Sequence, residues 1–544
     1  MNRPNPTQDT CTPAPSNAAS CPFATQAPQP AQPAQAEQSE QTASTAWPPG
    51  PAPGLMGWGL LRRMSRDLLG TLAQWRSEHG DAIHLRIWPE HQVVVTDPEL
   101  VRELLVGQHD ALVRWEHGIS VFAQLHGHSV LVSEGQPWRS KRQALLPAFS
   151  PKAVQAQIPA LAAAAQAALQ AWPQQSEDFP MEQALTALAM DVIMRLMFSG
   201  AIGEDARSAE QAIREVSHAA NSEFYWPLRW PDAMPWKRRK RRALAWLRSF
   251  IDRQVRLRLA QAEADWPEDL LSRLLRLHRG DAQAWTLQAV RDECMTAFLA
   301  GHETVASSLT WWSWCMATHP EAQQQVADEI QEQLQGRTPT AQDLPALRQL
   351  GWSLQEAMRL YPAAPVLISR RCTRPVQLGP WRLPARTLFM IAPGLMQRDA
   401  RWFPQPDAFQ PQRFADADKD GAPAAPRGSW MPFGTGPRVC LGQHLASTEM
   451  TVVAAMVLQR LRLSVPEGAG APRPVLQVTL RPSTPLRLRL QSRSGAAAHR
   501  PGKHGDNVAI YCAKSSTKHA NYAKLSPIRI YSVFLTRTTG LETI

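Results

Sequence analysis

One cysteine stands in a short loop whose residue types could hold a metal-containing cofactor. The loop, residues 433–442, reads Phe-Gly-Thr-Gly-Pro-Arg-Val-Cys-Leu-Gly, and Cys440 supplies its thiol. The glycines allow the backbone to turn sharply and to approach a flat group closely. We expect a helix to begin after Gly442, and the positive end of its dipole favours a thiolate at Cys440. Such a thiolate is a suitable ligand for haem iron, and Arg438 can reach an anionic group.

A carboxylate and a hydroxyl lie in the middle of a long apolar segment, residues 289–318. Apolar residues on all sides predict a helix that is buried within the protein. Glu303 and Thr304 are costly in such a place unless they have partners or a chemical role. Thr304 can bond to the carbonyl four residues earlier or to a ligand, and Gly301 lets a flat group lie against the helix. The rival interpretation is a core helix with a buried ion pair.

Two further pairs of residues have the spacing of neighbours on a helix. Trp138 and Arg142 are four residues apart and share one face, where an indole N–H and a guanidinium can hold a carboxylate. Glu356 and Arg359 are three residues apart and can form an ion pair. Taken alone, each pair is also typical of a routine surface contact.

Together these residues resemble the signature motifs of the cytochromes P-450. The haem-ligand loop of that family has the pattern F-x-x-G-x-R-x-C-x-G, which this chain matches at Phe433, Gly436, Arg438, Cys440 and Gly442. Four other motifs of the family, A/G-G-x-D/E-T, W-x-x-x-R, E-x-x-R and P-x-R-F, are matched at residues 300–304, 138–142, 356–359 and 411–414. The resemblance covers about residues 54–493 and points to the soluble, bacterial-style members.

The resemblance implies functional roles for the matched residues. Cys440 is the axial ligand of the haem iron, and the catalytic residues Glu303 and Thr304 manage proton delivery. The haem propionates are held by Trp138, Arg142, Arg438 and an arginine of the extended segment 366–371, for which we prefer Arg370, with Arg371 as the alternative. Further cofactor contacts are expected at Phe433, Gly436, Gly442 and Gly301.

The resemblance also implies a structural trio made of Glu356, Arg359 and Arg413, which holds the cysteine-side surface in shape. Two positions depart from the family's patterns. Gln397 replaces the histidine of a frequent H-R-D motif, so a propionate contact is missing there or is made by Gln397. Gln412 replaces an acidic residue, and we assign it no role.

The fold class expected from this resemblance is mainly α with small β-sheets, in a single large domain with the cytochrome P-450 fold. Periodicity predicts a helix over 68–79, strands over 82–87 and 92–96, a helix capped by Asp97, and mostly helical chain over 153–200 and 207–224. Residues 1–53 are rich in Pro, Ala and Gln and are expected to be a disordered tail. The domain spans 54–493, and 494–544 is an atypical extension, foreign to the fold and expected to be disordered.

Composition limits which binding partners and which cellular compartment we expect. The 544 residues carry a net charge of +11, but no motif suggests nucleic acid. The basic run 237–242, which follows an aromatic segment at 224–231, is typical of a solvated helix face; the sharper hypothesis is a weak peripheral contact with a membrane. The seven cysteines are scattered, which favours a reducing cytoplasm. With no apolar stretch long enough to span a membrane, we expect neither a signal peptide nor a transmembrane anchor.

The implied function is that of a haem-thiolate monooxygenase with haem b (iron protoporphyrin IX). Such an oxidoreductase inserts one atom of O2 into an apolar organic substrate, with electrons from NAD(P)H that a separate ferredoxin or flavodoxin and its reductase deliver. Ala297, Phe298, Val366 and Leu367 are expected to line an apolar pocket for a fatty acid, terpene or aromatic compound. The alternatives are a peroxide-driven peroxygenase and a haem-binding protein without turnover.

Overall fold

The computed structural model describes residues 47–199, 203–224, 233–416 and 427–493. Three of the sequence-based predictions therefore lie outside the described residues. They are the tail up to residue 46, the aromatic segment 225–231, and the extension 494–544.

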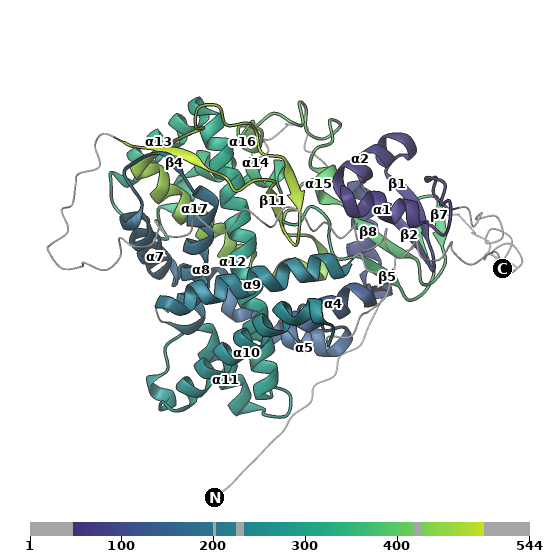
Figure 1. Ribbon diagram of the computed structural model, residues 1–544, viewed down its shortest axis with the longest axis horizontal. Helices are drawn as coiled ribbons and strands as arrows, with labels where there is room; N and C mark the ends of the chain where they lie inside the picture. Colours follow the sequence, from purple (N-terminus) through teal and green to yellow (C-terminus); the bar gives the residue numbers. More distant parts are fainter. Residues whose placement is uncertain (1–46, 200–202, 225–232, 417–426, 494–544) are drawn as a thin grey trace, which may run out of the picture. The chain divides into compact units, whose positions relative to one another are not determined.

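Helices dominate the described chain (Figure 1). The first eleven are α1 (Trp58–Arg66), α2 (Leu68–His79), α3 (Pro98–Arg102), α4 (Glu116–His126), α5 (Gly135–Leu145), α6 (Pro151–Gln155), α7 (Ile158–Ala171), α8 (Met181–Phe198), α9 (Gly203–Phe224), α10 (Arg238–Leu259) and α11 (Leu270–Gly280), within the described ranges. They are followed by α12 (Leu287–Thr318), α13 (Pro320–Leu334), α14 (Arg348–Leu360), α15 (Pro393–Met396), α16 (Arg413–Asp416) and α17 (Gln443–Arg460).

The strands form small sheets. They are β1 (Ala82–Ile87), β2 (Glu90–Val95), β3 (Leu112–Arg114), β4 (Gln175–Phe179), β5 (Arg370–Cys372), β6 (Val376–Leu378), β7 (Trp381–Leu383), β8 (Leu388–Ile391), β9 (Leu461–Ser464), β10 (Pro474–Leu476), β11 (Leu480–Pro482) and β12 (Leu488–Ser492). Within the described ranges the largest sheet has the order β1-β2-β8-β5-β3, and only its β2–β8 pair is parallel. A second sheet has the order β4-β12-β9.

The long helix α12 organises the core, and Figure 1 shows it beside α8 among the other helices. Its first half joins a hydrophobic cluster with α9, α10 and α11, and its second half joins another with α7, α14 and α17. Its tryptophans Trp311 and Trp312 are buried, and Trp311 Nε1 donates to the Leu480 carbonyl at 2.8 Å. The predicted buried helix over 289–318 is therefore confirmed.

Several local predictions agree with the structure. The helix over 68–79 is α2, with the predicted bounds, and the side chain of Asp97 accepts N–H bonds from the first turn of α3, where Pro98 stands. The prediction for 153–200 missed β4, because its sequence Gln-Ser-Glu-Asp-Phe pairs with a distant strand, β12. No helix in the described part of the chain is long and apolar enough to cross a membrane.

The described chain starts before Gly54, at Trp47. Its ring stacks on those of His84 and His91, with centroids 4.3 and 4.5 Å away, and the His84 N–H donates to the Pro49 carbonyl at 2.9 Å. A Cβ on Gly50 would lie 1.9 Å from the His84 carbonyl oxygen, so this segment runs directly against β1.

Candidate active site

The Cys440 loop is a tight turn that leads into α17. The Cys440 N–H donates to the Phe433 carbonyl at 2.9 Å. Phe433 packs on the hydrophobic cluster that the second half of α12 forms with α7, α14 and α17. Gly436 has a φ of +72°, and a Cβ there would lie 2.2 Å from the Leu105 carbonyl oxygen. Glycine is thus required at position 436 by the backbone and by the neighbouring π-helical turn Glu103–Gly107. Contacts of Phe433 and Gly436 with a cofactor stay predictions.

The thiol of Cys440 is exposed beside this loop. Even so, desolvation by the surrounding protein raises its pKa, while a hydrogen bond from the Gly442 N–H and the charge of Arg142 act in the opposite direction. The helix end alone was expected to favour the thiolate, but desolvation outweighs it. A cation at the sulfur would reverse that balance, because a coordinated thiol is held deprotonated.

Four arginines lie close enough to act on one another, and one of them, Arg142, also acts on the thiol: they are Arg114, Arg142, Arg370 and Arg438. Desolvation is the main cause that lowers the pKa of each, to about 10 for Arg370 and Arg438, and repulsion by other arginines of the group adds to it at Arg114, Arg370 and Arg438. Arg438 stacks over the Trp138 ring at 3.9 Å and pairs with Glu134. Arg142 Nη2 donates to the Val439 carbonyl, next to the thiol, at 3.0 Å.

This cluster carries more positive charge than its own carboxylate can balance. Glu134 is the acidic residue that pairs with Arg438 and, at 3.8 Å, with Arg114. Arg114 is buried, and its Nε has no hydrogen-bond partner among the described residues. Sequence reasoning missed Arg114, which belongs to no motif; β3 pairs with β5 in a register that sets it opposite Arg370. Like charges opposed in this way are destabilising, so the site favours a ligand with more than one negative charge.

Arg370 and Arg371 lie on opposite faces of β5, because side chains alternate along a strand. Arg371 is committed to Glu90 and Glu116, each at 2.7 Å, and the hydrogen bond that it donates to Glu90 is the main cause that raises its pKa. Arg370 instead belongs to the arginine cluster. The geometry therefore favours Arg370 over Arg371 as the propionate ligand.

One face of α12 remains open in the middle of the helix. Over residues 292–313, every described side chain is buried except those at Ala297, Ala300, Gly301 and Thr304. Their spacing places them on a single helical face. Thr304 Oγ1 donates to the Ala300 carbonyl at 2.8 Å, the back-bond expected from the sequence.

Gly301 lies against another helix. A Cβ on Gly301 would come within 2.6 Å of Ile193 Cδ1 on α8, so the close neighbour of this glycine is a side chain of the protein. Ala300, the residue before it, is exposed on the open face. The packing against Ile193 is one reason for glycine at this position, and contact between Gly301 and the cofactor stays a prediction.

Both oxygens of the buried Glu303 carboxylate are engaged. Oε1 accepts from Arg481 Nη2 and Oε2 from Ser217 Oγ, each at 3.1 Å. The other side of the Arg481 guanidinium reaches Glu182 at 3.1 Å. Glu303 thus joins α12 to α9 through Ser217 and to β11 through Arg481.

The expected structural trio forms a buried network. Glu356 and Arg359 are 0% exposed and are joined by two hydrogen bonds of 2.7 and 2.9 Å, and Arg413 Nε adds a third to Glu356 at 3.0 Å. Gln397 belongs to this region: its amide donates to the Met358 and Arg359 carbonyls and accepts from the Met431 N–H. Its side chain is therefore occupied by backbone groups and does not stand in for a propionate-binding histidine.

Two other expectations need correction. Phe298 is buried and packs on Phe250, with centroids 6.1 Å apart, so it does not line the open face of α12. In the basic run, Lys237 and Lys240 are buried and pair with Glu223 at 3.4 and 2.7 Å. The run is therefore only in part a solvated face.

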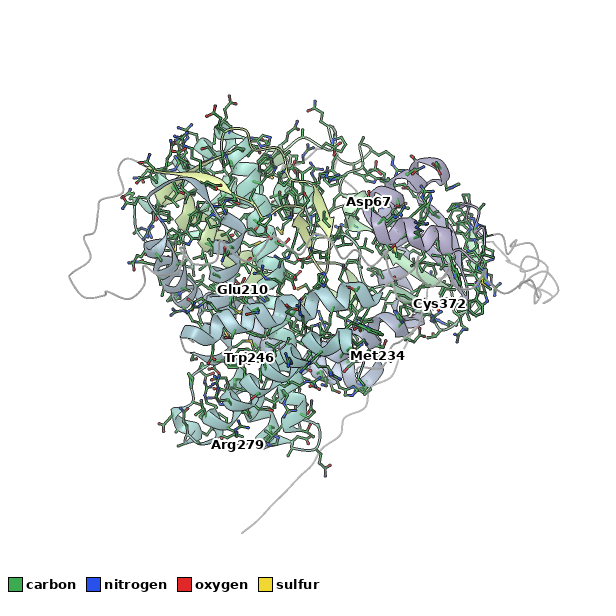
Figure 2. All side chains as sticks on the ribbon, in the orientation of Figure 1. Asp67, Glu210, Met234, Trp246, Arg279 and Cys372 are labelled. Carbon is green, nitrogen blue, oxygen red and sulfur yellow. The ribbon has the colours of Figure 1, made fainter. Side chains whose placement is uncertain are left out.

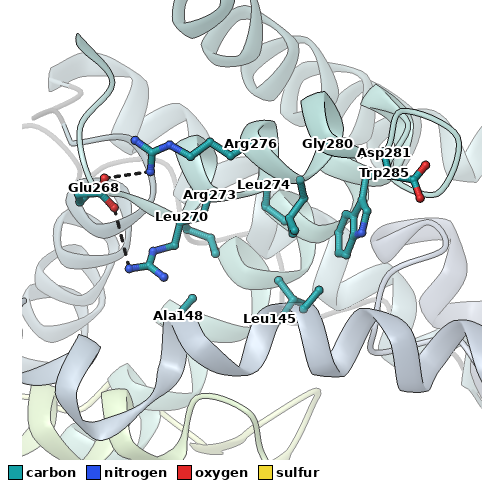
Figure 3. Close-up of a pocket in the computed structure, with 12 residues that line it drawn as sticks. Leu145, Ala148, Glu268, Leu270, Arg273, Leu274, Arg276, Gly280, Asp281 and Trp285 are labelled. Carbon is teal, nitrogen blue, oxygen red and sulfur yellow. Dashed lines mark ion pairs between the residues drawn. The ribbon is translucent and has the colours of Figure 1, made fainter. Parts of the chain in front are cut away.

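Two clefts flank the segment that follows Arg142. One, of about 450 Å³, is lined by Cys440, Val439, Arg142, Phe149 and His444, among others. The second, of about 540 Å³, lies between α5 and α11 and does not include Cys440. In Figure 3, Leu145, Leu274 and Trp285 line the apolar part of this second cleft, and Glu268 pairs with Arg273 and Arg276 beside it.

Comparison with known proteins gives consistent matches. The family model described as cytochrome P-450 matches residues 48–490. A cyclooctat-9-en-7-ol 5-monooxygenase of Streptomyces melanosporofaciens is 33% identical over 77% of this chain and 90% of its own length. A cyclooctatin synthase of the same organism is 31% identical over 81% of this chain and 94% of its own. A pentalenene oxygenase of Streptomyces avermitilis is 29% identical over 82% of this chain and 98% of its own.

Proposed function

This chain belongs to the cytochrome P-450 family, and from that premise we propose the reaction and the residues that carry it. The chain is a haem-thiolate monooxygenase that uses O2, an organic substrate and redox partners. We infer that one atom of O2 enters an apolar substrate and that the electrons come from NAD(P)H. The observation that carries the proposal is the surplus of guanidinium charge around Arg142, next to Cys440, the exposed thiol among the four described cysteines.

The residues present fit haem b. Cys440 would be the axial ligand, and Arg114, Arg142, Arg370 and Arg438 would hold the two propionates, whose negative charges offset the repulsion within the cluster. Support comes from the unpartnered Nε of Arg114 and the lowered pKa of every arginine in the group. When bound, the haem supplies the oxygen-activating chemistry, and the protein supplies orientation and electrostatics.

The side chains of α12 would manage protons and water. Thr304 lies on the open face, and the adjacent Glu303 is held by Ser217 and Arg481. We assign Glu303 as the proton carrier and Thr304 as the hydroxyl that passes the proton into the site. Arg481 orients the carboxylate, because its Nη2 donates to Glu303 Oε1 at 3.1 Å.

We propose a cyclic, apolar alkene or its alcohol as the substrate. Two relatives carry names with a compound of that kind, cyclooctat-9-en-7-ol and pentalenene. In this chain Ala297, Ala300, Val366 and Leu367 are small or apolar and are not fully buried. Such side chains suit a rigid hydrocarbon, which a pocket recognises by its shape and with few hydrogen bonds.

For electron supply we propose a separate, acidic ferredoxin or flavodoxin with its reductase, in the cytoplasm. The net charge of +11 favours an acidic partner. The cleft that contains Cys440 and Arg142 gives such a partner access to the thiol side of the site. The described cysteines Cys294, Cys315, Cys372 and Cys440 are free thiols, which suits a reducing compartment.

An isotope experiment tests this function. The purified holoenzyme is supplied with ¹⁸O2, NADPH, a ferredoxin and its reductase, and pentalenene as the probe. We expect product that carries one labelled oxygen atom. Product that forms only with added peroxide would support the peroxygenase alternative. No oxidation of any compound in an alkene panel, with haem bound and reducible, would support a protein without turnover.

A further inference from the structure

The cleft between α5 and α11 has the size of a small-molecule site. Its volume is about 540 Å³, and ligand sites in proteins usually measure about 300–1,000 Å³. Neither Cys440 nor Arg142 lines it. The reaction proposed above therefore makes no use of this cleft.

The floor of the cleft is apolar. Leu145, Leu274 and Trp285 are 5, 0 and 8% exposed, and Figure 3 shows them around the space between α5 and α11. Ala144, near the end of α5, and Ala148, in the turn that follows, contribute only methyl groups to the same lining. Large apolar side chains beside small ones leave room for the apolar body of a ligand.

The wall that contains Trp285 is fixed by contacts on its far side. The Trp285 N–H donates to the Asp281 carbonyl at 2.9 Å, and His278 Nδ1 donates to the Trp285 carbonyl at 2.7 Å. Lys141 Nζ lies 5.9 Å from the centroid of the Trp285 ring and pairs with Glu293 of α12 at 3.0 Å. The cleft is therefore preformed, so a ligand need not order its walls.

Two arginines of α11 stand at one end of the cleft. Glu268 lies 2.9 Å from Arg276 Nη1 and 4.0 Å from Arg273 Nη2, as Figure 3 shows. The second distance is too long for a hydrogen bond, so the pairing with Glu268 leaves N–H donors of Arg273 available to a ligand. The Glu268 side chain is 69% exposed, and exposed ion pairs contribute little. An incoming anion can therefore share the two guanidinium groups.

Positive charge exceeds negative charge at this end of the cleft. Glu263 is a second carboxylate there, and it lies 3.8 Å from Arg276 and also pairs with Arg279. Arg279, labelled in Figure 2, stacks over Trp266 at 4.5 Å and does not line the cleft. Three guanidinium groups of α11 thus share two carboxylates. The Asp281 carboxylate is at the other end, where backbone N–H groups donate to it.

We propose that this cleft binds a small amphipathic carboxylate, with its apolar body on the floor and its carboxylate between Arg273 and Arg276. Planar guanidinium groups match a carboxylate in shape and charge. An inorganic anion would leave the apolar floor uncovered, and a neutral hydrocarbon would leave the arginine donors unused. Because the cleft does not include the thiol, the bound molecule is a second ligand and not the compound that is oxidised.

Calorimetric titration of the full-length holoenzyme tests the proposal. Clotrimazole, an azole that ligates haem iron, is first added to saturation, so that the oxidation site is filled and binding elsewhere is measured. The probes are naphthylacetate and naphthylacetamide, which share their ring and differ in charge. We expect one naphthylacetate to bind per protein, about tenfold or more tightly than the amide, because the amide forms no charge-assisted hydrogen bond with the arginines.

Variants of the cleft locate the binding. Arg273→Gln with Arg276→Gln should weaken naphthylacetate about tenfold or more and leave the amide unchanged. Ala148→Trp, which places a large ring in the cleft, should abolish binding of both probes. A matched control is Arg238→Gln with Arg242→Gln, which removes two exposed arginines of α10 and should change neither affinity. Unaltered haem content and thermal unfolding show that each variant is folded.

The proposal is overturned if naphthylacetate does not bind the azole-saturated wild type, or binds no better than the amide. It is also overturned by unchanged binding in the Arg273 and Arg276 variant. Loss of binding in the α10 control would show a general attraction of anions to a basic surface, and binding only without azole would place the carboxylate in the oxidation site. Either result contradicts the proposal. None of these measurements depends on turnover, so they test the cleft separately from the proposed reaction.

Discussion

At the scale of single residues, we predict that one substitution in the arginine cluster stabilises the apoprotein and weakens haem binding. Replacing Arg370 with Met removes one of several cations that repel one another, so apoprotein should unfold at a higher temperature than the wild type. The same change removes a ligand of the cofactor. We expect haem to dissociate about tenfold faster, the effect of one charge-assisted hydrogen bond. Unfolding of apoprotein and haem transfer to apomyoglobin measure the two effects.

The matched control for this prediction is Arg139→Met, which removes an exposed arginine of α5. It should change neither quantity. If Arg370→Met lowers the unfolding temperature of the apoprotein, the arginines do not repel one another as the structure indicates. If haem transfer is unchanged, Arg370 does not hold the cofactor.

The Glu303 carboxylate gives a second prediction at this scale. Glu303→Gln keeps a side chain able to bond Ser217, but it removes the group that takes up a proton. We expect turnover to fall about 100-fold, the usual size of a lost acid–base step, with haem content unchanged. The rate of product formation per haem measures the effect.

Ser217→Ala is the control for Glu303. It deletes a single hydrogen bond to the carboxylate and should leave turnover within a few-fold of the wild type. If Glu303→Gln turns over as fast as the wild type, the carboxylate does not carry protons and is only a structural partner of Arg481.

At the scale of elements, the contact between α8 and α12 explains Gly301. In Gly301→Ala the new methyl group meets Ile193, which a Cβ would approach to 2.6 Å. Overpacking of this kind costs about 1–3 kcal/mol, to be measured by denaturant unfolding. Adding Ile193→Ala should restore much of the loss. If the double variant is no more stable than Gly301→Ala, the helix contact is not the reason for the glycine.

We expect the stability of the folded protein to depend on pH through His84, which lies on β1 of the largest sheet. Its imidazole nitrogen lies 3.0 Å from that of His91 beneath Trp47, and burial, with His91 and Arg86, lowers its pKa from 6.5 to about 4. Between these values the unfolded chain is protonated at this position and the folded chain is not. Stability that is present above pH 6.5 should therefore be lost as the pH falls toward about 4.

Thermal unfolding across that pH range tests the role of His84. Phe at position 84 keeps a ring for Trp47 to stack on and removes the titration, so the variant should lose less stability than the wild type. Glu90 and Arg86, which also face the pair, stay in place. His109→Gln, at an exposed turn, is the control. Parallel curves for wild type and His84→Phe would show that this imidazole does not couple protonation to folding.

At the scale of the whole molecule, motifs and periodicity predicted more of the fold than of the site. The bounds of α2, the cap of α3 and the buried α12 follow from local sequence, because helix caps and apolar periodicity act over a few residues. Arg114 could not be found in this way, since its neighbours in the cluster come from β5, α5 and the Cys440 loop. The direction of Phe298 and the partner of Gly301 likewise depend on which helix packs against which face.

The central claim is that the Cys440 sulfur is bonded, as a thiolate, to haem iron. The most direct measurement is the absorption spectrum of the purified, reduced holoenzyme under carbon monoxide, with Cys440→His measured beside it. We predict the main band of the wild type at the position of thiolate-ligated haem, and in the variant a band at the position of histidine-ligated haem. A histidine-type band in the wild type, or purification without any haem, would contradict the account.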